Sequence, residues 1–141
     1  MRFRIAVAML GALSVSIWSA QPPKEIKKVP VTQTSPVSGS EMFRTYCAVC
    51  HGVDGKGGGP AADSLKQAPA DLTQLTILSN GKYPEDRVSQ SISGNLQIRA
   101  HGSPDMPMCG DLFKSLNGGN DNLVRLRVAN LTDYIKSIQA K

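Results

Sequence analysis

The chain has 141 residues, with 16 basic and 11 acidic side chains and a formal net charge of +5. From Gly39 onward, however, 11 basic side chains stand against 10 acidic ones, so this part carries a net charge of only +1. The length suits one small domain, and the nearly neutral charge excludes a nucleic-acid-binding protein that relies on a basic surface.

The first twenty residues have the pattern of an export signal. Arg2 and Arg4 form a short basic region, and an uncharged apolar stretch and small residues follow. The apolar stretch is shorter than the roughly 20 residues that a membrane helix needs. We therefore expect residues 1–20 to be a signal peptide and the protein to be periplasmic. Because Trp18 occupies a position where a small residue is preferred, an uncleaved membrane anchor is the alternative.

Residues 21–38 are predicted to form a flexible tether. This stretch contains prolines at four positions and lysines at three, with few large apolar side chains. Such a composition favours an extended, mobile chain over a packed core. A disordered tail without a role would have the same composition. The folded domain is expected to span residues 39–141.

The pattern of apolar residues in this domain indicates an all-α fold with about four to five short helices. Ser38 and Glu41 have the spacing of a capping box, which predicts a helix that ends near Gly52. Pro84 and Gly94 have the positions expected for the start and the end of another helix. Residues 111–116 could form a helical turn. The last helix is predicted by a stripe with steps of four and three: Val124, Val128, Leu131, Ile135 and Ile138.

The motif Cys47-Ala48-Val49-Cys50-His51 carries the most information about function. Two thiols three positions apart, followed at once by an imidazole, form the attachment pattern of c-type haem. The two sulfurs, one helical turn apart, can each bond to the porphyrin, and His51 can then bind the iron.

Two other sites use paired cysteines. A thioredoxin-type redox pair belongs near a βαβ pattern, which the sequence does not show. A structural zinc site needs four ligands, and His101 and Cys109 do not have the usual spacing to complete one. The pattern therefore favours one covalent haem c, attached through Cys47 and Cys50.

The sixth position on the iron needs a second ligand, and four residues are candidates: His101, Met106, Met108 and Cys109. Met106 precedes Pro107, which favours an extended backbone and suits a loop that passes close to a haem face. In an extended segment Met106 and Met108 point to opposite sides, so one of them at most reaches the iron. Met42 is more simply a core residue of the first helix.

From Gly39 to its end, the chain resembles the class I c-type cytochromes, in particular the small bacterial monohaem domains. The resemblance rests on the haem motif, the glycine-rich loop 54–60, the segment 100–107 and the last helix. It implies the cytochrome c fold, with short helices packed around one haem. It implies that Met106 is the distal iron ligand and that Pro60 offers its carbonyl to the second ring nitrogen of His51. The Gly39 and Phe43 region should cross against Tyr134.

The chain departs from its relatives at one position near the predicted distal ligand. Related domains often carry tryptophan two residues after the Met-Pro pair, where this chain has Cys109. A small buried apolar residue is the simplest interpretation of Cys109. An intermolecular disulfide, an oxidation-sensitive thiol and a competing iron ligand are the alternatives.

These features together predict an exported monohaem cytochrome c that carries single electrons between respiratory or dehydrogenase partners and is not an enzyme. We expect a monomer that binds redox proteins and no nucleic acid. One alternative is a subunit that delivers electrons into a larger periplasmic oxidoreductase complex. Another is a haem sensor or peroxidase with an open sixth position on the iron.

Overall fold

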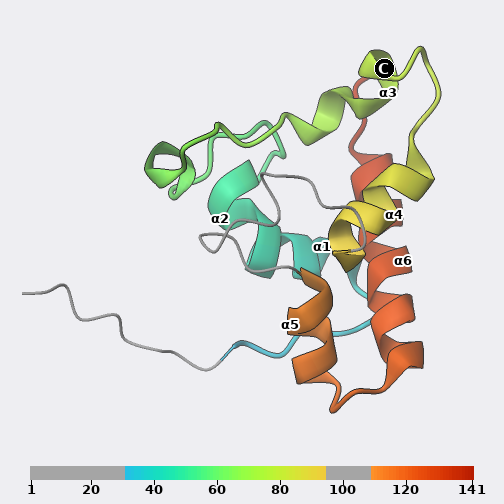
Figure 1. The fold of residues 1–141 in the computed structure, drawn as a ribbon. Coiled ribbons are helices and arrows are strands. Elements are labelled where there is room, and N and C mark those ends of the chain that lie inside the picture. The colour runs from blue at the N-terminus through green and yellow to red at the C-terminus, as the bar shows by residue number, and fades with distance from the viewer. Residues whose placement is uncertain (1–30, 95–108) are drawn as a thin grey trace, which may run out of the picture.

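The computed structural model describes residues 31–94 and 109–141 (Figure 1). The predicted signal peptide and most of the predicted tether lie outside the described residues, as do His101, Met106 and Met108. Every regular element in the described ranges is helical, which confirms the all-α prediction. None of the helices in those ranges is both long and apolar enough to cross a bilayer.

Three short elements follow one another at the start of the domain: α1 (Gly39–Met42), the π-helical segment η1 (Phe43–Cys47) and α2 (Ala48–His51). A loop with little regular structure comes next and contains η2 (Ala62–Ser64), η3 (Leu72–Gln74) and α3 (Leu75–Leu78). The longer helices are α4 (Glu85–Ser93), α5 (Cys109–Leu116) and α6 (Asp121–Ser137). Of these elements, the sequence did not indicate η2, η3 or α3.

The first helix begins where the capping box predicts, but only half of the box forms. The Ser38 side chain accepts a hydrogen bond from the Glu41 backbone N–H at 3.3 Å. The Glu41 carboxylate accepts from the Ser35 backbone N–H at 3.1 Å. The Glu41 carboxylate therefore bonds to the segment before the helix, at Ser35, and not to the backbone N–H of the N-cap residue Ser38.

The π-helical segment η1 ends at Cys47, the first residue of the haem motif, and its π-helical form was not predicted. At its end the Ala48 N–H donates to the carbonyl of Phe43, five residues back instead of four. A π-helical turn rotates the residues that follow relative to an uninterrupted α-helix, and such turns occur often at functional sites. Here η1 sets the direction in which α2 presents Cys50 and His51.

The elements α1, η1 and α2 run without a break over residues 39–51 and are called the first helical stretch. The core lies where this stretch crosses α6 (Figure 1). The rings of Phe43 and Tyr134 have their centroids 5.2 Å apart, and Gly39 lies directly against the Asn130 carbonyl. This contact confirms the predicted crossing. The largest fully buried side chains come from the first stretch, α5 and α6: Met42, Phe43, Phe113 and Leu131.

Helix α4 packs on α6 through Val88 and Ile92, both buried as its pattern predicts. It ends at Gly94, whose left-handed conformation agrees with the predicted terminator. Pro84 is the N-cap residue of α4, whereas the sequence predicts it as the first residue of the helix. These contacts fix α4 along one side of α6.

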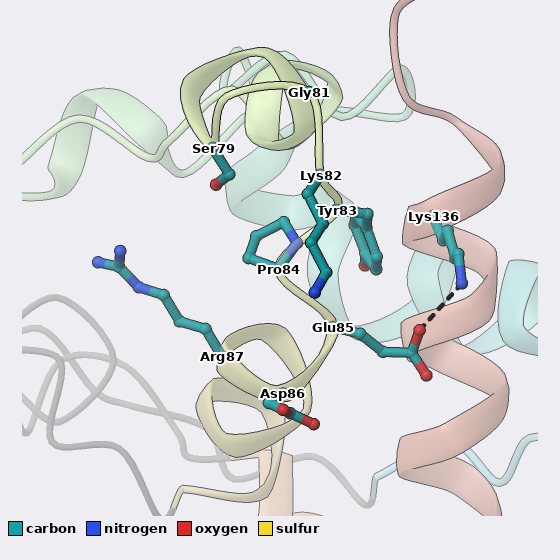
Figure 2. A pocket seen from close by; sticks show the side chains of 9 residues that line it. All are labelled: Ser79, Gly81, Lys82, Tyr83, Pro84, Glu85, Asp86, Arg87 and Lys136. Atoms are coloured by element: carbon teal, nitrogen blue, oxygen red, sulfur yellow. Dashed lines mark hydrogen bonds and ion pairs between the residues drawn. The ribbon is translucent and has the colours of Figure 1, made fainter.

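Polar contacts add to this packing just before and at the start of α4. The Tyr83 hydroxyl donates to the Thr132 carbonyl at 3.0 Å, and Lys136 forms an exposed ion pair with Glu85 at 2.9 Å (Figure 2). Exposed ion pairs contribute little to stability, so the buried apolar contacts carry most of this interface.

The segment before α1 is attached to the domain, although the sequence predicts a tether up to Ser38. Thr34 is buried, and its hydroxyl and carbonyl oxygens accept hydrogen bonds from Arg127 at 2.9 and 2.8 Å. The Tyr46 hydroxyl lies 3.0 Å from the Thr34 hydroxyl and donates to the Thr32 carbonyl at 2.6 Å. Residues 31–38 therefore pack against η1 and α6.

The end of the chain holds the loop that carries α3. The side-chain oxygen of Gln139 accepts from the Thr76 backbone N–H at 2.9 Å, and its amide donates to the Leu72 carbonyl at 2.6 Å. The Ala140 N–H donates to the Thr73 carbonyl at 2.8 Å. These bonds place the carboxyl terminus beside α3, as Figure 1 shows.

Candidate functional site

The motif lies at the end of the first helical stretch. Cys47 is the last residue of η1, and Cys50 and His51 belong to α2. Residues three positions apart lie on the same face of a helix, so both thiols face one side. Both cysteines are partly buried, while the His51 side chain is 5% exposed. The end of the helix thus carries two partly buried thiols, followed directly by a buried imidazole.

The glycine-rich loop closes the end of this helix. The N–H groups of Gly57, Gly59 and Ala61 donate to the carbonyls of His51, Cys50 and Val49, at 2.7, 3.0 and 2.8 Å. The last carbonyls of a helix have no partner inside the helix, and here the loop supplies one for each. The loop therefore fixes the backbone from which His51 projects.

The imidazole of His51 is oriented by a backbone carbonyl. Its Nδ1 atom lies 3.0 Å from the carbonyl oxygen of Ala70. A carbonyl oxygen can only accept, so Nδ1 carries the hydrogen, and in the neutral ring the lone pair then belongs to Nε2. A metal-binding histidine usually donates its other N–H in this way, which fixes the tautomer and the ring orientation.

The resemblance implied that the Pro60 carbonyl makes this contact, and the structure corrects that expectation. The neighbours of Pro60, Gly59 and Ala61, bond to carbonyls of the first helical stretch, and the chain reaches the imidazole ten residues later, at Ala70. The sequence contains no side-chain feature that indicates Ala70, because its contribution comes from the backbone alone. A contact between Pro60 and a haem stays a prediction.

The loop segment that carries the Ala70 carbonyl is fixed by contacts before and after this residue. A side chain at Gly57 would overlap the Pro69 carbonyl oxygen, so the two backbones touch at this point. After Ala70, the Leu72 N–H donates to the Gly55 carbonyl at 2.7 Å, and the Asp71 carboxylate accepts from the Thr73 N–H at 2.8 Å. The Ala70 carbonyl is therefore fixed relative to the motif by the chain itself.

Electrostatics at His51 favour the neutral ring. Burial lowers the pKa of His51 below its ordinary value, and the hydrogen bond to Ala70 opposes this effect in part. A neutral imidazole is the form that binds a metal ion. The buried position, the defined tautomer and the two thiols one turn away all fit a haem c bonded at Cys47 and Cys50.

The third cysteine lies beside the first. Cys109 is the first residue of α5, and like Cys47 it packs against the hydrophobic core. Interaction with the Cys109 side chain, more than burial, raises the pKa of Cys47. Cys109 is partly buried and packs against the core, which agrees in part with the prediction of a small buried residue.

The described residues contain no group of three or more His, Cys, Asp or Glu side chains that could hold a metal ion. A four-ligand zinc site is thus not formed within residues 31–94 and 109–141. Three of the candidates for the sixth position on the iron, His101, Met106 and Met108, fall in the range between them. Their roles stay predictions.

One open hollow on the surface lies away from the motif. It is lined by charged and polar side chains around the start of α4, including Lys82, Arg87 and Lys136 (Figure 2). Of the predicted haem residues within the described ranges, none lines it, so this hollow is not the site that the motif indicates.

Comparison with protein families gives a match to the Cytochrome c family over residues 36–139, which includes the motif, the loop and all of α6. The chain belongs to the cytochrome c family. Comparisons with curated proteins and with solved structures gave no significant match. Cytochromes c carry covalently bound haem c and in general transfer electrons, and Cys47, Cys50 and His51 have the spacing that such attachment requires. The family match and the all-helical fold confirm the resemblance that the sequence shows.

Proposed function

We propose that this cytochrome is an exported electron carrier with one haem c attached through Cys47 and Cys50. The observation that carries the proposal is the orientation of His51, whose Nδ1 atom is bonded to Ala70 and whose Nε2 atom holds the lone pair. Bound haem supplies an iron that takes up and releases one electron. The protein then has to hold the iron's ligands and limit access to the site.

Met106 is proposed as the second iron ligand. A thioether stabilises ferrous iron, so a histidine and a methionine together favour a relatively high reduction potential. With both axial positions filled by side chains, small molecules cannot reach the iron, and this favours electron transfer over catalysis.

The partners are proposed to be redox proteins that bind briefly. Val49 and Val53 are exposed on either side of Cys50 and His51 and offer apolar contacts next to the motif. Weak electron-transfer interfaces are small, commonly under about 1,200 Å² in total. A permanent place in a larger periplasmic oxidoreductase complex is the second candidate, and an uncleaved amino terminus would attach either form to the membrane.

Replacement of the methionines tests the proposal. The ferric wild-type protein should show the weak far-red charge-transfer band of a sulfur-ligated haem, and the reduced protein should bind carbon monoxide poorly. Met106→Ala should remove the band, admit carbon monoxide and lower the potential, whereas the control Met108→Ala should change little. A wild-type protein without the band that binds carbon monoxide readily would favour a sensor or peroxidase instead.

A further inference from the structure

The open hollow at the start of α4 has a volume of about 820 Å³ and carries free positive charge. Lys136, at its edge, is already paired with Glu85 at 2.9 Å. Three further charged side chains line the hollow: Lys82, Asp86 and Arg87. None of the three forms an ion pair within residues 31–94 and 109–141. Two free cations therefore stand against one free carboxylate.

The two free cations lie on opposite sides of a proline ring. In Figure 2, Arg87 and Ser79 extend on one side of Pro84, and Lys82 lies on the other. The Asp86 side chain extends away from Arg87 in this view. Pro84 itself is half-buried, so its ring forms an apolar floor between the cations. A ligand that meets both cations needs two separated anionic groups joined by an apolar part.

Hydrogen bonds within the protein hold the backbone on both sides of the hollow. The Gly81 N–H donates to the Thr76 carbonyl at 2.9 Å, which closes the turn between α3 and α4. The Tyr83 hydroxyl donates to the Thr132 carbonyl at 3.0 Å, which fixes the next residues against α6. A surface that is already ordered loses less conformational entropy when a ligand binds.

Two large apolar side chains are exposed directly before Ser79, which lines the hollow. Ile77 is 54% exposed and Leu78 is 76% exposed, although α3 is held to the end of the chain through Gln139. Protein interfaces commonly combine apolar contacts at their centre with charged groups at their rim. The free cations and the exposed apolar pair together have this composition.

We propose that this hollow is a docking surface for an acidic segment of a partner protein. Carboxylates of the segment pair with Lys82 and Arg87, and apolar side chains between the carboxylates contact Pro84, Ile77 and Leu78. The surface is separate from the motif, because no motif residue lines the hollow. A partner bound here leaves the motif accessible to a second protein, a consequence that rests on the function proposed above.

A small anion and a membrane surface match the hollow less closely than a protein segment does. Sites for small molecules enclose most of the ligand, whereas this hollow is open. Anionic bilayers attract clusters of several basic side chains, whereas Glu85 and Asp86 stand among the cations here. A protein segment can place its carboxylates next to the cations and away from Asp86.

Titration of the purified full chain with a peptide at low ionic strength tests the proposal. The probe is a short acetylated and amidated peptide with Glu residues on both sides of two Leu residues, and binding is followed by amide chemical shifts. Shifts should concentrate at residues 76–87, and added salt should weaken binding. An analogue with Gln in place of Glu should bind at least about fivefold more weakly. An analogue with Ser in place of Leu should also bind more weakly, and equal affinity would overturn the role of the apolar side chains.

Two variants matched in charge identify the site. Lys82→Gln/Arg87→Gln removes the free cations of the hollow, and Arg44→Gln/Lys66→Gln removes the same charge at exposed positions elsewhere. The peptide should bind the first variant at least about fivefold more weakly than wild type, and the second within about twofold. Equal weakening in both variants, or no binding by wild type, would overturn the proposal. Phosphatidylserine vesicles that bind wild type but not the first variant, while the peptide binds neither, would assign the hollow to a membrane instead.

Electron transfer with the peptide bound tests the separation of this surface from the motif. Oxidation of the reduced, haem-loaded protein by a small cobalt complex should change by less than about twofold at saturating peptide, because salt screens charges that lie far from the motif. A rate that falls in proportion to the bound fraction would overturn the separation. A chain that binds the peptide at the hollow but carries no haem would instead overturn the proposed function and leave the docking surface standing.

Discussion

The Nδ1 atom of His51 lies 3.0 Å from the carbonyl oxygen of Ala70, 19 residues further along the chain. The helix that carries His51 and the loop that carries Ala70 are joined through glycine backbones, because Gly57 both donates to the His51 carbonyl and touches Pro69. The orientation of the imidazole thus depends on a position that has no side chain. This dependence can be tested by adding one carbon atom.

Gly57→Ala should displace the loop that bears the Ala70 carbonyl. The new methyl group would overlap the Pro69 carbonyl oxygen, and Gly57 has a φ of +90°, which other residues rarely adopt. We expect the free energy of unfolding to fall by about 1–3 kcal/mol. The reduction potential of the haem-loaded protein should shift as well, because the hydrogen bond to the ligating histidine is weakened.

Gly58→Ala is the matched control for this variant. A side chain at Gly58 would meet no atom within 4 Å. Its free energy of unfolding should stay within about 0.5 kcal/mol of wild type, and its potential should not move. Equal effects of the two substitutions, measured by chemical denaturation and voltammetry, would show that the loop does not orient His51 in this way.

A second prediction concerns the segment in front of α1. Arg127 is 2% exposed, and two of its nitrogen atoms donate to Thr34. Thr34→Val keeps the shape of the side chain but removes the hydroxyl, and so leaves one guanidinium donor buried without that acceptor. A lost bond to a charged group costs about 1.5–3 kcal/mol, and we expect the free energy of unfolding to fall by that amount.

Thr32→Val provides the control, because Thr32 is exposed and contributes its backbone carbonyl to Tyr46. Its stability should match wild type within about 0.5 kcal/mol. Limited proteolysis of Thr34→Val should also cut the amino-terminal segment faster than in the control. If Thr34→Val proves as stable and as resistant as Thr32→Val, the segment is not held by Arg127.

The sequence predicted the parts of the molecule that depend on local patterns. The stripe of α6 and the terminator Gly94 follow from periodicity and backbone preference, and the structure confirms both. The attachment motif is a local pattern too, and its position at the end of the first helical stretch agrees with the prediction.

Features that depend on contacts between distant residues could not be predicted in this way. The Ala70 carbonyl lies opposite His51 only because the loop returns to the motif, and any residue there would supply the same group. The contact of the Phe113 ring with Tyr46 likewise requires α5 to pack against η1. The composition of residues 21–38 favours a mobile tether, but Thr34 is buried and accepts two hydrogen bonds from Arg127. These long-range bonds hold the segment to the domain, and composition alone does not indicate them.

A third prediction concerns stability at alkaline pH. Burial first, and then the charges of Glu85 and Asp133, raise the pKa of Tyr83 well above its ordinary value of about 10. The folded protein therefore keeps a proton that the unfolded chain loses above pH 10. Stability from this group is complete below pH 10 and decreases as the pH rises, because ionisation would cost Tyr83 its hydrogen bond to Thr132.

Tyr83→Phe removes this titration. The free energy of unfolding of wild type should decrease more steeply with pH above 10 than that of Tyr83→Phe. The difference should stay below about 1.4 kcal/mol per pH unit, because the side chain is only partly buried. Parallel curves for the two proteins between pH 9 and 12, the approximate range over which tyrosine titrates, would contradict the raised pKa.

The last prediction concerns the covalent attachment itself. Protein produced with haem-ligation machinery should keep its haem after denaturation and acid–organic extraction, and its mass should increase by that of one haem. Cys47 and Cys50 lie one helical turn apart, so each should contribute one thioether.

Cys47→Ser and Cys50→Ser should each retain haem through the remaining sulfur, whereas the double variant should lose all of it on extraction. Cys109→Ser should retain as much as wild type under reducing conditions, because Cys109 lies outside the motif. Haem that can be extracted from the wild-type protein would rule out covalent attachment, and retention by the double variant would assign it to another residue.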